Sequence, residues 1–418
     1  MQPLIDRADH WEWLSAERDR LLDFGQNIVA PGGGAYYLDE TGQPDPSKGI
    51  QTYLTCRAVH VYSLGAMLGT PGAREIAKGA MAGLTGQLHD DEHGGWFPGV
   101  DLAGQPLEDA AKQCYQHAFV VLAASTATAA GLSGARELLD RAVEVLIDKF
   151  WDEEDAMCVD QWDRTWSTLD SYRGVNGNMH AVEALLAAAD VLDSHEIRER
   201  AHMITRNVIS FSATNEWRIP EHFTADWEPD LELNREHPDD PFKPFGATVG
   251  HGFEWARLIL HLEASLTDDL IESLFESATG LFARAMIDGW AVDGADGFVY
   301  TTDWEGAPVV HDRMHWVAAE AIAAAAALYK RTGRKAYVEW YEQWWAYVIT
   351  HLMDRGNGSW HHQLDRNNVV TNTVWPGKPD LYHAYQAALI PALPLAPALS
   401  MGVKSGLLAA AEDGLATE

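Results

Sequence analysis

The chain has 418 residues, of which 47% are hydrophobic and 10% aromatic, and its formal net charge at pH 7 is −32. A chain of this length can bury a large core, and its charge disfavours nucleic acid and anionic membranes as partners because both repel an acidic surface. The three cysteines, Cys56, Cys114 and Cys158, lack the spacing of a disulfide framework or a thiolate metal site, so we expect reduced core thiols.

The first part of the chain predicts helices of two kinds. Residues 1–7 contain no apolar signal core, and no later run approaches membrane-spanning length, so we expect a cytoplasmic protein without a membrane segment. Residues 10–29 place apolar residues among charges at helical spacing, which predicts an amphipathic helix. A Gly/Pro-rich loop at 31–49 leads to a much less polar helix at 51–68. A break at 70–72 precedes a third helix that we expect to end near residue 88.

The alternation of apolar and amphipathic helices then continues to the end of the chain. Apolar helices are predicted to begin near residues 113, 176, 251, 315 and 380, and amphipathic helices to cover about 134–150, 195–211, 268–287 and 334–353. Turn-rich aromatic loops separate them. Residues 297–304 predict a short hairpin, and the longest loop, about 214–248, is a natural lid.

This count gives twelve helices in six pairs. The even-numbered helices are apolar nearly all round and should be buried on both sides, whereas the odd-numbered ones should form an outer layer. Polar landmarks recur at the start of the even helices, roughly 60 to 70 residues apart: Arg57, His117, His180, His251, His315 and His383. The pattern predicts an all-α (α/α)6 barrel, a single catalytic domain over residues 1–418. Short hairpins and long loops should lie at the end where the inner helices begin and the pocket forms.

One helix start joins two titratable residues on an otherwise apolar face. His251 and Glu254 are three residues apart and share that face with Leu258 and Leu262, so they form either a candidate acid–base pair or a hydrogen-bonded core pair. Taken singly, other rim residues also have structural explanations, such as an ion pair for Arg57 or a satisfied core histidine at His117 and His315. Their recurrence at one end of the helices favours a site, whose candidate members are Arg57, Tyr115, Asn176, His180, His251, Glu254, Trp316, Glu320 and His383.

The rim histidines indicate proton transfer. His180 and His383 each occupy the first turn of a predicted helix, where the partial positive charge of the helix N-terminus disfavours the imidazolium. Two neutral imidazoles facing one pocket could take and return protons near neutral pH. Glycoside hydrolysis, an alternative for this fold, needs a pair of carboxyl groups. Asp303, Glu305 and Asp312 keep that alternative open.

Metal and phosphate chemistry have less support. The His-x-x-Glu spacing at 251–254 and the adjacent His361 and His362 could supply metal ligands. However, the chain has neither a His-Glu-x-x-His motif nor the acidic cluster that a magnesium or manganese sugar isomerase would use, and it lacks a phosphate-binding glycine loop. We therefore expect no catalytic metal and no phosphate site.

Several segments together resemble a known family. They are Leu54-Thr-Cys-Arg57-Ala-Val-His60, Lys112-Gln-Cys-Tyr115-Gln-His117, Tyr172-Arg-Gly-Val-Asn176-Gly-Asn-Met-His180, Gly250-His251-Gly-Phe-Glu254-Trp255 and Trp375-Pro-Gly-Lys-Pro-Asp380-Leu-Tyr-His383. With them nearly the whole chain resembles the N-acylglucosamine 2-epimerase superfamily, and within it the branch of mannose and sulfoquinovose isomerases. The resemblance implies an (α/α)6 barrel and metal-independent, cofactor-free aldose–ketose isomerisation of an unphosphorylated monosaccharide.

The resemblance also implies roles for individual residues. His251 and His383 match the family's two acid–base histidines, and the remaining candidates match positions that line its sugar pocket: Arg57, Tyr115, Asn176, His180, Glu254, Trp316 and Glu320. We expect His251 to move a proton between C2 and C1 through a cis-enediol and His383 to assist ring opening, although the two roles could be exchanged. Arg57 or a protonated His180 would stabilise the enediolate oxygen.

The choice of sugar depends on two positions. Where the sulfoquinovose branch is expected to hold the sulfonate with polar amides, this chain has His362 and Pro379, and proline has no N–H to donate. An uncharged sugar is therefore favoured, with D-mannose to D-fructose as the expected reaction and D-lyxose to D-xylulose as a side activity. Isomerisation of sulfoquinovose to sulfofructose, sugar 2-epimerisation and a non-catalytic sugar-binding protein remain alternatives. The sequence leaves open whether the protein is a monomer or a homo-oligomer.

Overall fold

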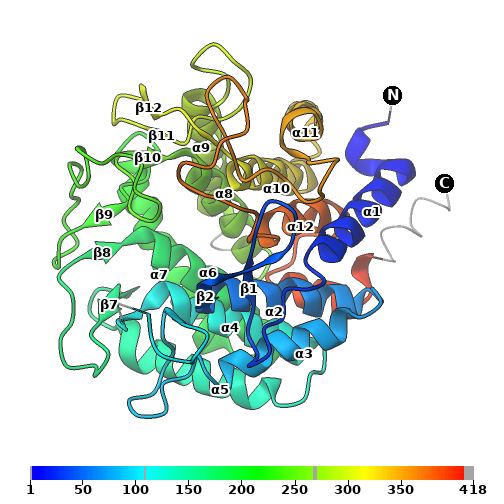
Figure 1. Ribbon diagram of the computed structural model, residues 1–418. Helices are drawn as coiled ribbons and strands as arrows, with labels where there is room; N and C mark the ends of the chain where they lie inside the picture. Colours follow the sequence, from blue (N-terminus) through cyan, green and yellow to red (C-terminus); the bar gives the residue numbers. More distant parts are fainter. Residues whose placement is uncertain (1, 108–109, 267–270, 409–418) are drawn as a thin grey trace.

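Helices alternate between an inner and an outer ring in the computed structural model, which describes residues 2–107, 110–266 and 271–408 (Figure 1). The inner helices are α2 (Thr52–Met67), α4 (Cys114–Ala129), α6 (Val175–Leu192), α8 (Val249–Glu263), α10 (His315–Thr332) and α12 (Tyr382–Leu389). The outer helices are α1 (Ala8–Phe24), α3 (Ala73–Leu84), α5 (Ala135–Val145), α7 (His195–Ala213), α9 (Ile271–Gly289) and α11 (Lys335–Tyr347). The predicted all-α, paired-helix architecture is confirmed.

The two ends of the chain close the ring. Each inner helix packs against the next, and α12 returns to pack against α2. Each outer helix covers the inner helix that precedes it, as α3 covers α2, whereas α1 covers α12. The first and last long helices consequently lie side by side, as the blue α1 and the orange-red α12 show (Figure 1).

The side-chain pattern explains which helices are inside. In α10, a run of alanines lets neighbouring helices approach closely on both sides, and every residue from Val317 to Leu328 is buried. Outer helices bury one stripe only: α5 buries Ala135, Leu138, Leu139 and Ala142, which recur at helical spacing. Because the inner helices are buried along their length, polar side chains are expected mainly at their N-terminal turns and in the adjoining loops.

Most element boundaries lie within a few residues of the prediction. The exceptions are α1 and α3, which end at Phe24 and Leu84 instead of near 29 and 88. Gly25 follows α1, and a Cβ there would lie 2.5 Å from the Tyr62 hydroxyl, so the chain turns where only glycine fits. Two π-helical turns, η2 (Leu146–Phe150) and η4 (Val348–Leu352), extend α5 and α11 to their predicted ends. The predicted helix start at 268 lies outside the described residues.

A turn of one kind, which is not among the predicted elements, precedes every inner helix. Its first residue accepts a hydrogen bond through its side chain from the backbone N–H four residues later. Its fourth residue has a left-handed backbone. The first residues are Asp39, Asp101, Asp163, Thr224, Asp303 and Asp365, and the left-handed residues are Gly42, Gly104, Trp166, Trp227, Gly306 and Asn368. The sixfold repeat therefore includes the loops at the pocket end.

Short antiparallel strands tie these loops to the helix starts. Two three-stranded sheets contain β1 (Tyr36–Leu38), β2 (Pro44–Gln51) and β3 (Gly99–Val100), and β10 (Ala247–Thr248), β11 (Thr301–Thr302) and β12 (Pro308–Val310). The two-stranded pairs are β4 (Lys112–Gln113) with β7 (Gln161–Trp162), β5 (Trp151–Asp152) with β6 (Met157–Cys158), β8 (Arg173–Gly174) with β9 (His222–Phe223), and β13 (Arg313–Met314) with β14 (Gln363–Leu364). The predicted hairpin is β11–β12, although it extends to 310. Three further short helices are η1 (Leu4–Asp6), η5 (Ile390–Ala392) and α13 (Leu399–Lys404).

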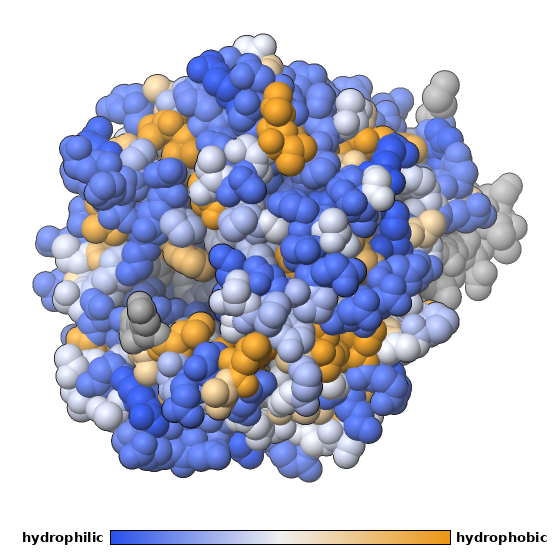
Figure 2. Space-filling model, in the orientation of Figure 1, coloured by the Kyte–Doolittle hydropathy of each residue, from blue (hydrophilic) through white to orange (hydrophobic). Residues whose placement is uncertain are grey.

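The surface and the thiols agree with the composition. The face in Figure 2 is predominantly hydrophilic, with hydrophobic residues in separate small patches. Cys56, Cys114 and Cys158 are free and buried, as predicted. Among the helices of the described residues, none has the length and apolarity needed to cross a membrane.

Candidate active site

A cavity opens where the inner helices begin, with about 710 Å³ of empty space when the solvent at its mouth is included. Each inner helix contributes a side chain from its first turns, and loops complete the wall. The lining residues are Tyr53, Leu54, Arg57, Tyr115, Asn176, His180, Pro241, Phe242, Pro244, His251, Glu254, Tyr300, His315, Trp316, His362, Trp375, Pro379, Asp380 and His383. The structure therefore brings together eight of the nine predicted site residues; Glu320 does not line the cavity.

The two candidate proton carriers both lie next to Trp316. The indole ring is 5.4 Å from the ring of His251 and 5.8 Å from the ring of His383, measured between centroids. Each histidine has a carboxylate next to its Nδ1 atom. Nδ1 of His251 lies 3.0 Å from Oε1 and 2.9 Å from Oε2 of Glu221. Nδ1 of His383 lies 2.5 Å from Oδ2 of Asp380. Because an ionised carboxylate can only accept a hydrogen bond, we assign the ring proton of each neutral histidine to Nδ1. The Nε2 atom of each ring is then unprotonated and can act as a base.

Burial keeps two of the cavity histidines neutral. It lowers the pKa of His383 to about 4, even though Asp380 attracts the proton in the opposite direction. It likewise lowers the pKa of His180 to about 4 against the pull of Glu183. At pH 7 both imidazoles are therefore uncharged, so His180 would act as a hydrogen-bonding group and not as a cation.

Arg57 is already paired in the cavity wall. Its Nη1 donates to Asp380 Oδ2 at 3.1 Å and its Nη2 to the Tyr115 hydroxyl at 3.1 Å. Although burial opposes ionisation, His383 and Arg57 hold the pKa of Asp380 well below its usual range. The guanidinium and the carboxylate offset each other, which leaves this side of the cavity close to neutral.

A second charged cluster lies at the base of the cavity and explains the position of Glu320. Arg257 donates through Nε to Glu320 at 2.8 Å, and its other nitrogens lie 3.9 Å from Glu183 and 3.5 Å from Glu254. Glu183 in turn accepts hydrogen bonds from the Tyr382 hydroxyl and from Gln386. Glu320 therefore holds Arg257 instead of facing the cavity, which departs from the expected substrate contact.

The carboxylates do not form a good cation site. Within the described residues, ligand atoms approach one another in three groups: His315 with Asp380 and His383, His180 with Glu183 and Glu254, and Glu254 with Glu320 and His383. However, Asp380 is paired with Arg57, and Arg257 lies beside the other three carboxyl groups. A positive charge next to every carboxyl group opposes a divalent cation, so this donor set does not fit one. The absence of a catalytic metal stays a prediction.

Several residues of the site were not predicted. Asp380 had a usable signal, since it precedes His383 by the same three residues that separate His251 from Glu254. Glu221 had none: it lies in a loop, and the pairing of β8 with β9 brings it to the start of α6, where Val175 N–H donates to its carbonyl at 3.1 Å. His315 lines the cavity and stacks on His362 at 3.9 Å, whereas His117 is a satisfied core histidine, bonded to Gln113 and Trp96.

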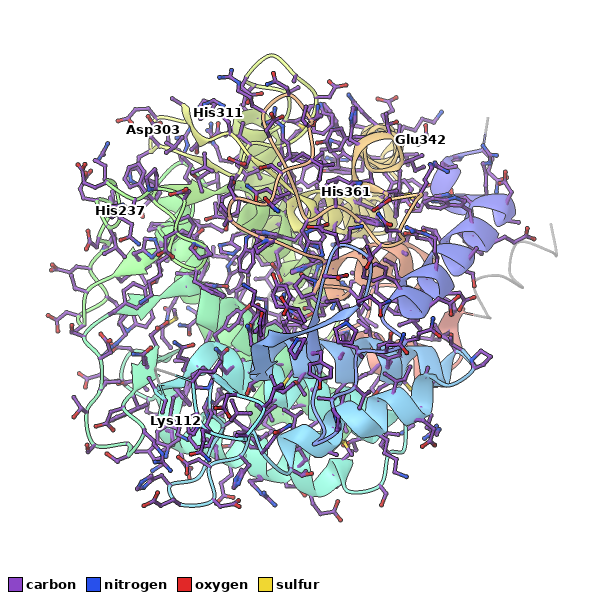
Figure 3. The ribbon with its side chains drawn as sticks, viewed as in Figure 1. Lys112, His237, Asp303, His311, Glu342 and His361 are labelled. Carbon is purple, nitrogen blue, oxygen red and sulfur yellow. The ribbon has the colours of Figure 1, made fainter. Side chains whose placement is uncertain are left out.

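The long loop forms part of the cavity wall. Pro241, Phe242 and Pro244 line it, and the Phe242 ring lies edge-on to Trp375 at 5.5 Å. Elsewhere this loop faces outward: the labelled His237, with Asp303 and His311 on neighbouring loops, lies at the periphery of the molecule (Figure 3). The predicted lid thus already contacts the opposite loop, and its opening stays a prediction.

Comparison with known proteins places this chain in a family. The family model of N-acylglucosamine 2-epimerase matches residues 33–387. A D-mannose isomerase from Thermobifida fusca is 48% identical over 396 residues, which is 94% of this chain and 97% of that protein. The chain belongs to the N-acylglucosamine 2-epimerase family. Another D-mannose isomerase of this kind, from Pseudomonas cannabina pv. alisalensis, is 44% identical over 398 residues, covering 94% of each chain.

Solved structures agree with this N-acylglucosamine 2-epimerase fold. A crystal structure of D-mannose isomerase superposes with a TM-score of 0.84 at 28% identity, over 94% of this chain and 99% of that chain. Cellobiose 2-epimerase from Spirochaeta thermophila superposes with a TM-score of 0.79 at 22% identity, over 91% and 95% of the two chains, and at that identity only the fold is comparable.

Proposed function

We propose that this member of the N-acylglucosamine 2-epimerase family interconverts D-mannose and D-fructose without metal or cofactor. The observation that carries the proposal is the pair formed by His251 and His383, each with Nδ1 held by a carboxylate and both against Trp316. Relatives at 48% and 44% identity that are named D-mannose isomerase support the choice of sugar. The free, buried cysteines support a cytoplasmic location.

The two histidines would divide the proton transfers. His383 assists ring opening by exchanging a proton with the ring oxygen or the anomeric hydroxyl. His251 then takes the proton from C2 of the open aldose and returns it to C1 through a cis-enediol, because one base on one face can reach both carbons. Arg57, whose charge Asp380 offsets, and the neutral His180 would stabilise the developing enediolate as hydrogen-bonding groups of the wall.

An uncharged sugar fits the wall better than a sulfonate. Asp380 offsets the charge of Arg57 at 3.1 Å, and Pro379 has no N–H to donate. Burial and the neighbouring His315 lower the pKa of His362 well below its usual value, so it adds no cation. D-Lyxose, which lacks only C6 of mannose, would fit the same wall and give D-xylulose as a side product.

Proton NMR of EDTA-treated enzyme with D-mannose in D2O would test the proposal. We expect D-fructose with deuterium at C1. Glucose as the main product would identify a 2-epimerase, and turnover of sulfoquinovose but not mannose would overturn the assigned sugar. Activity that EDTA abolishes and manganese or zinc restores would contradict the metal-free mechanism.

A further inference from the structure

Glu254 is a buried carboxyl group without a hydrogen-bond donor. It lines the base of the cavity and is 0% exposed, and neither of its oxygens has a hydrogen-bond partner among the described residues. The nearest charged nitrogen is Arg257 Nη2 at 3.5 Å, and His180 Nδ1 lies at 4.0 Å. An ionised carboxylate without donors is strongly destabilised in such a place, whereas a neutral carboxylic acid is not.

The charges around Glu254 favour the same state. Burial and the nearby Glu320 raise its pKa well above the usual value, and Arg257 opposes them. Arg257 is shared, however, since it donates to Glu320 at 2.8 Å and also lies near Glu183. The titratable groups that face Glu254 are Arg57 from α2, Tyr115 from α4, His180 and Glu183 from α6, Arg257 from α8, Glu320 from α10, and Tyr382 and His383 from α12.

Aldose–ketose isomerisation needs a group that exchanges hydroxyl protons. When C2 loses its proton, the carbonyl oxygen O1 must gain one to give the enediol; when C1 gains a proton, O2 must lose one to become the new carbonyl. A carboxylic acid can donate from its O–H to O1 and accept the O2 proton on its other oxygen, and it is then the same acid again. A carboxylate would have no proton to give to O1 until it had taken one from O2, and an amide cannot take up and return a proton in this way.

We propose that Glu254 stands in the resting site as a carboxylic acid and carries the hydroxyl proton from O2 to O1, while His251 carries the carbon-bound proton from C2 to C1. This proposal rests on the isomerase function proposed above. The two carboxyl oxygens of Glu254 have no hydrogen-bond partner among the described residues, so they are available to bind O1 and O2 of the sugar. Proton balance is kept because one proton moves between carbons and one between oxygens.

The protonation state can be measured without turnover. Enzyme labelled with ¹³C at the glutamate carboxyl carbon should show a protonated carboxyl signal at pH 7, and Glu254→Gln should remove it. If no glutamate of the wild-type enzyme is protonated at pH 7, the proposal is overturned, even if Glu254→Gln does not fold. Because this measurement needs no substrate, it separates failure of the acid assignment from failure of the proposed isomerase function.

The proton exchange is tested with mannose in D2O. In Glu254→Gln, His251 can still remove the C2 proton, but the intermediate returns to mannose because O1 and O2 cannot exchange. We expect fructose formation to fall about 10²- to 10⁴-fold, while deuterium entry at C2 of mannose falls much less. Glu254→Asp keeps an acid and should retain the wild-type ratio of exchange to product at a lower rate. Glu263→Gln, a buried glutamate of the same helix paired with Arg331, is the matched control.

Two outcomes would overturn the exchange role. If fructose formation and deuterium entry fall by the same factor in Glu254→Gln, the residue only positions the site. If both stay at the wild-type level, it has no part in the reaction. Absence of isomerisation in the wild-type enzyme would remove the exchange role together with the proposed function, whereas the ¹³C result would still stand.

Discussion

Nδ1 of His383 lies 2.5 Å from Oδ2 of Asp380, three residues earlier in the chain. Arg57 donates to the same oxygen at 3.1 Å. One carboxylate therefore orients a proposed proton carrier and offsets a guanidinium of the cavity wall. This arrangement links the tautomer of His383 to the proposed selection of an uncharged sugar.

Asp380→Asn should make the enzyme sensitive to anions. Removing the carboxylate leaves Arg57 without its ion pair, so we expect competitive inhibition by sulfate to strengthen about tenfold or more, which corresponds to about 1.4 kcal/mol. The turnover number should also fall because His383 loses its partner. Steady-state kinetics at fixed ionic strength would measure both effects.

Asp312→Asn is the matched control for that experiment. Asp312 accepts a hydrogen bond from Gln363 and does not line the cavity. The variant removes the same unit of charge near the rim but leaves the Arg57–Asp380 pair intact. Equal sulfate inhibition in both variants would mean that net charge, and not the pair, controls anion binding.

His251→Ala and His383→Ala should each lose about 10²- to 10⁴-fold in turnover, the usual contribution of a positioned acid–base group. Circular dichroism should show an unchanged helical content. His195→Ala is the control, since His195 is exposed at the start of α7 and should keep wild-type activity. A turnover number near the wild-type value in either cavity variant would refute its role as a proton carrier.

Glu221→Gln tests the partner of His251. The amide removes a charge-assisted hydrogen bond worth about 1.5–3 kcal/mol, so we expect a fall of about ten- to a hundredfold in the turnover number. KM should change much less because Glu221 does not line the cavity. Glu228→Gln, on an exposed part of the same loop, should have no effect. A change in KM alone would instead indicate that Glu221 shapes sugar binding.

Stability should decrease on mild acidification. Burial lowers the pKa values of His60, His180, His261 and His383 to about 4 from 6.5. Between these two values the unfolded chain binds protons that the folded chain does not, so the free energy of unfolding falls as the pH falls through this window. The raised pKa values of Asp155, Asp160, Asp190, Glu254 and Glu320 act in the opposite direction. The lowered imidazoles outnumber them, because burial also lowers the pKa of His10 to about 4 and that of His117 to about 3.

Urea unfolding at about pH 7.5 and about pH 5 would measure this decrease, which is about 1.4 kcal/mol per unit of pH for each proton that the unfolded chain binds and the folded chain does not. The midpoint and the slope should be recorded together, so that a change in stability is separated from a change in the exposed surface. An unfolding free energy that is constant or larger at the lower pH would contradict the buried, neutral state of these histidines.

The helices could be predicted because their signals are local. The alternation between helices apolar all round and helices with one apolar stripe follows directly from side chains three and four residues apart. The same spacing identified the cavity end, since Arg57, His180, His251 and His383 all fall near the start of apolar helices. The repeated turns from Asp39 to Asp365 carry an equally local signal, a side-chain acceptor followed three residues later by a residue with a left-handed backbone.

Contacts between distant segments could not be read from the sequence. The sequence by itself determined the ring of helix pairs and eight of the cavity residues, because helical periodicity fixes which side chains share a face. Only the tertiary structure decided that Glu221 reaches His251, that Asp380 pairs with Arg57, and that Glu320 binds Arg257 outside the cavity. These pairings depend on how loops and neighbouring helices pack against one another. The partners are far apart in the sequence, so their spacing along the chain does not reveal that they are in contact.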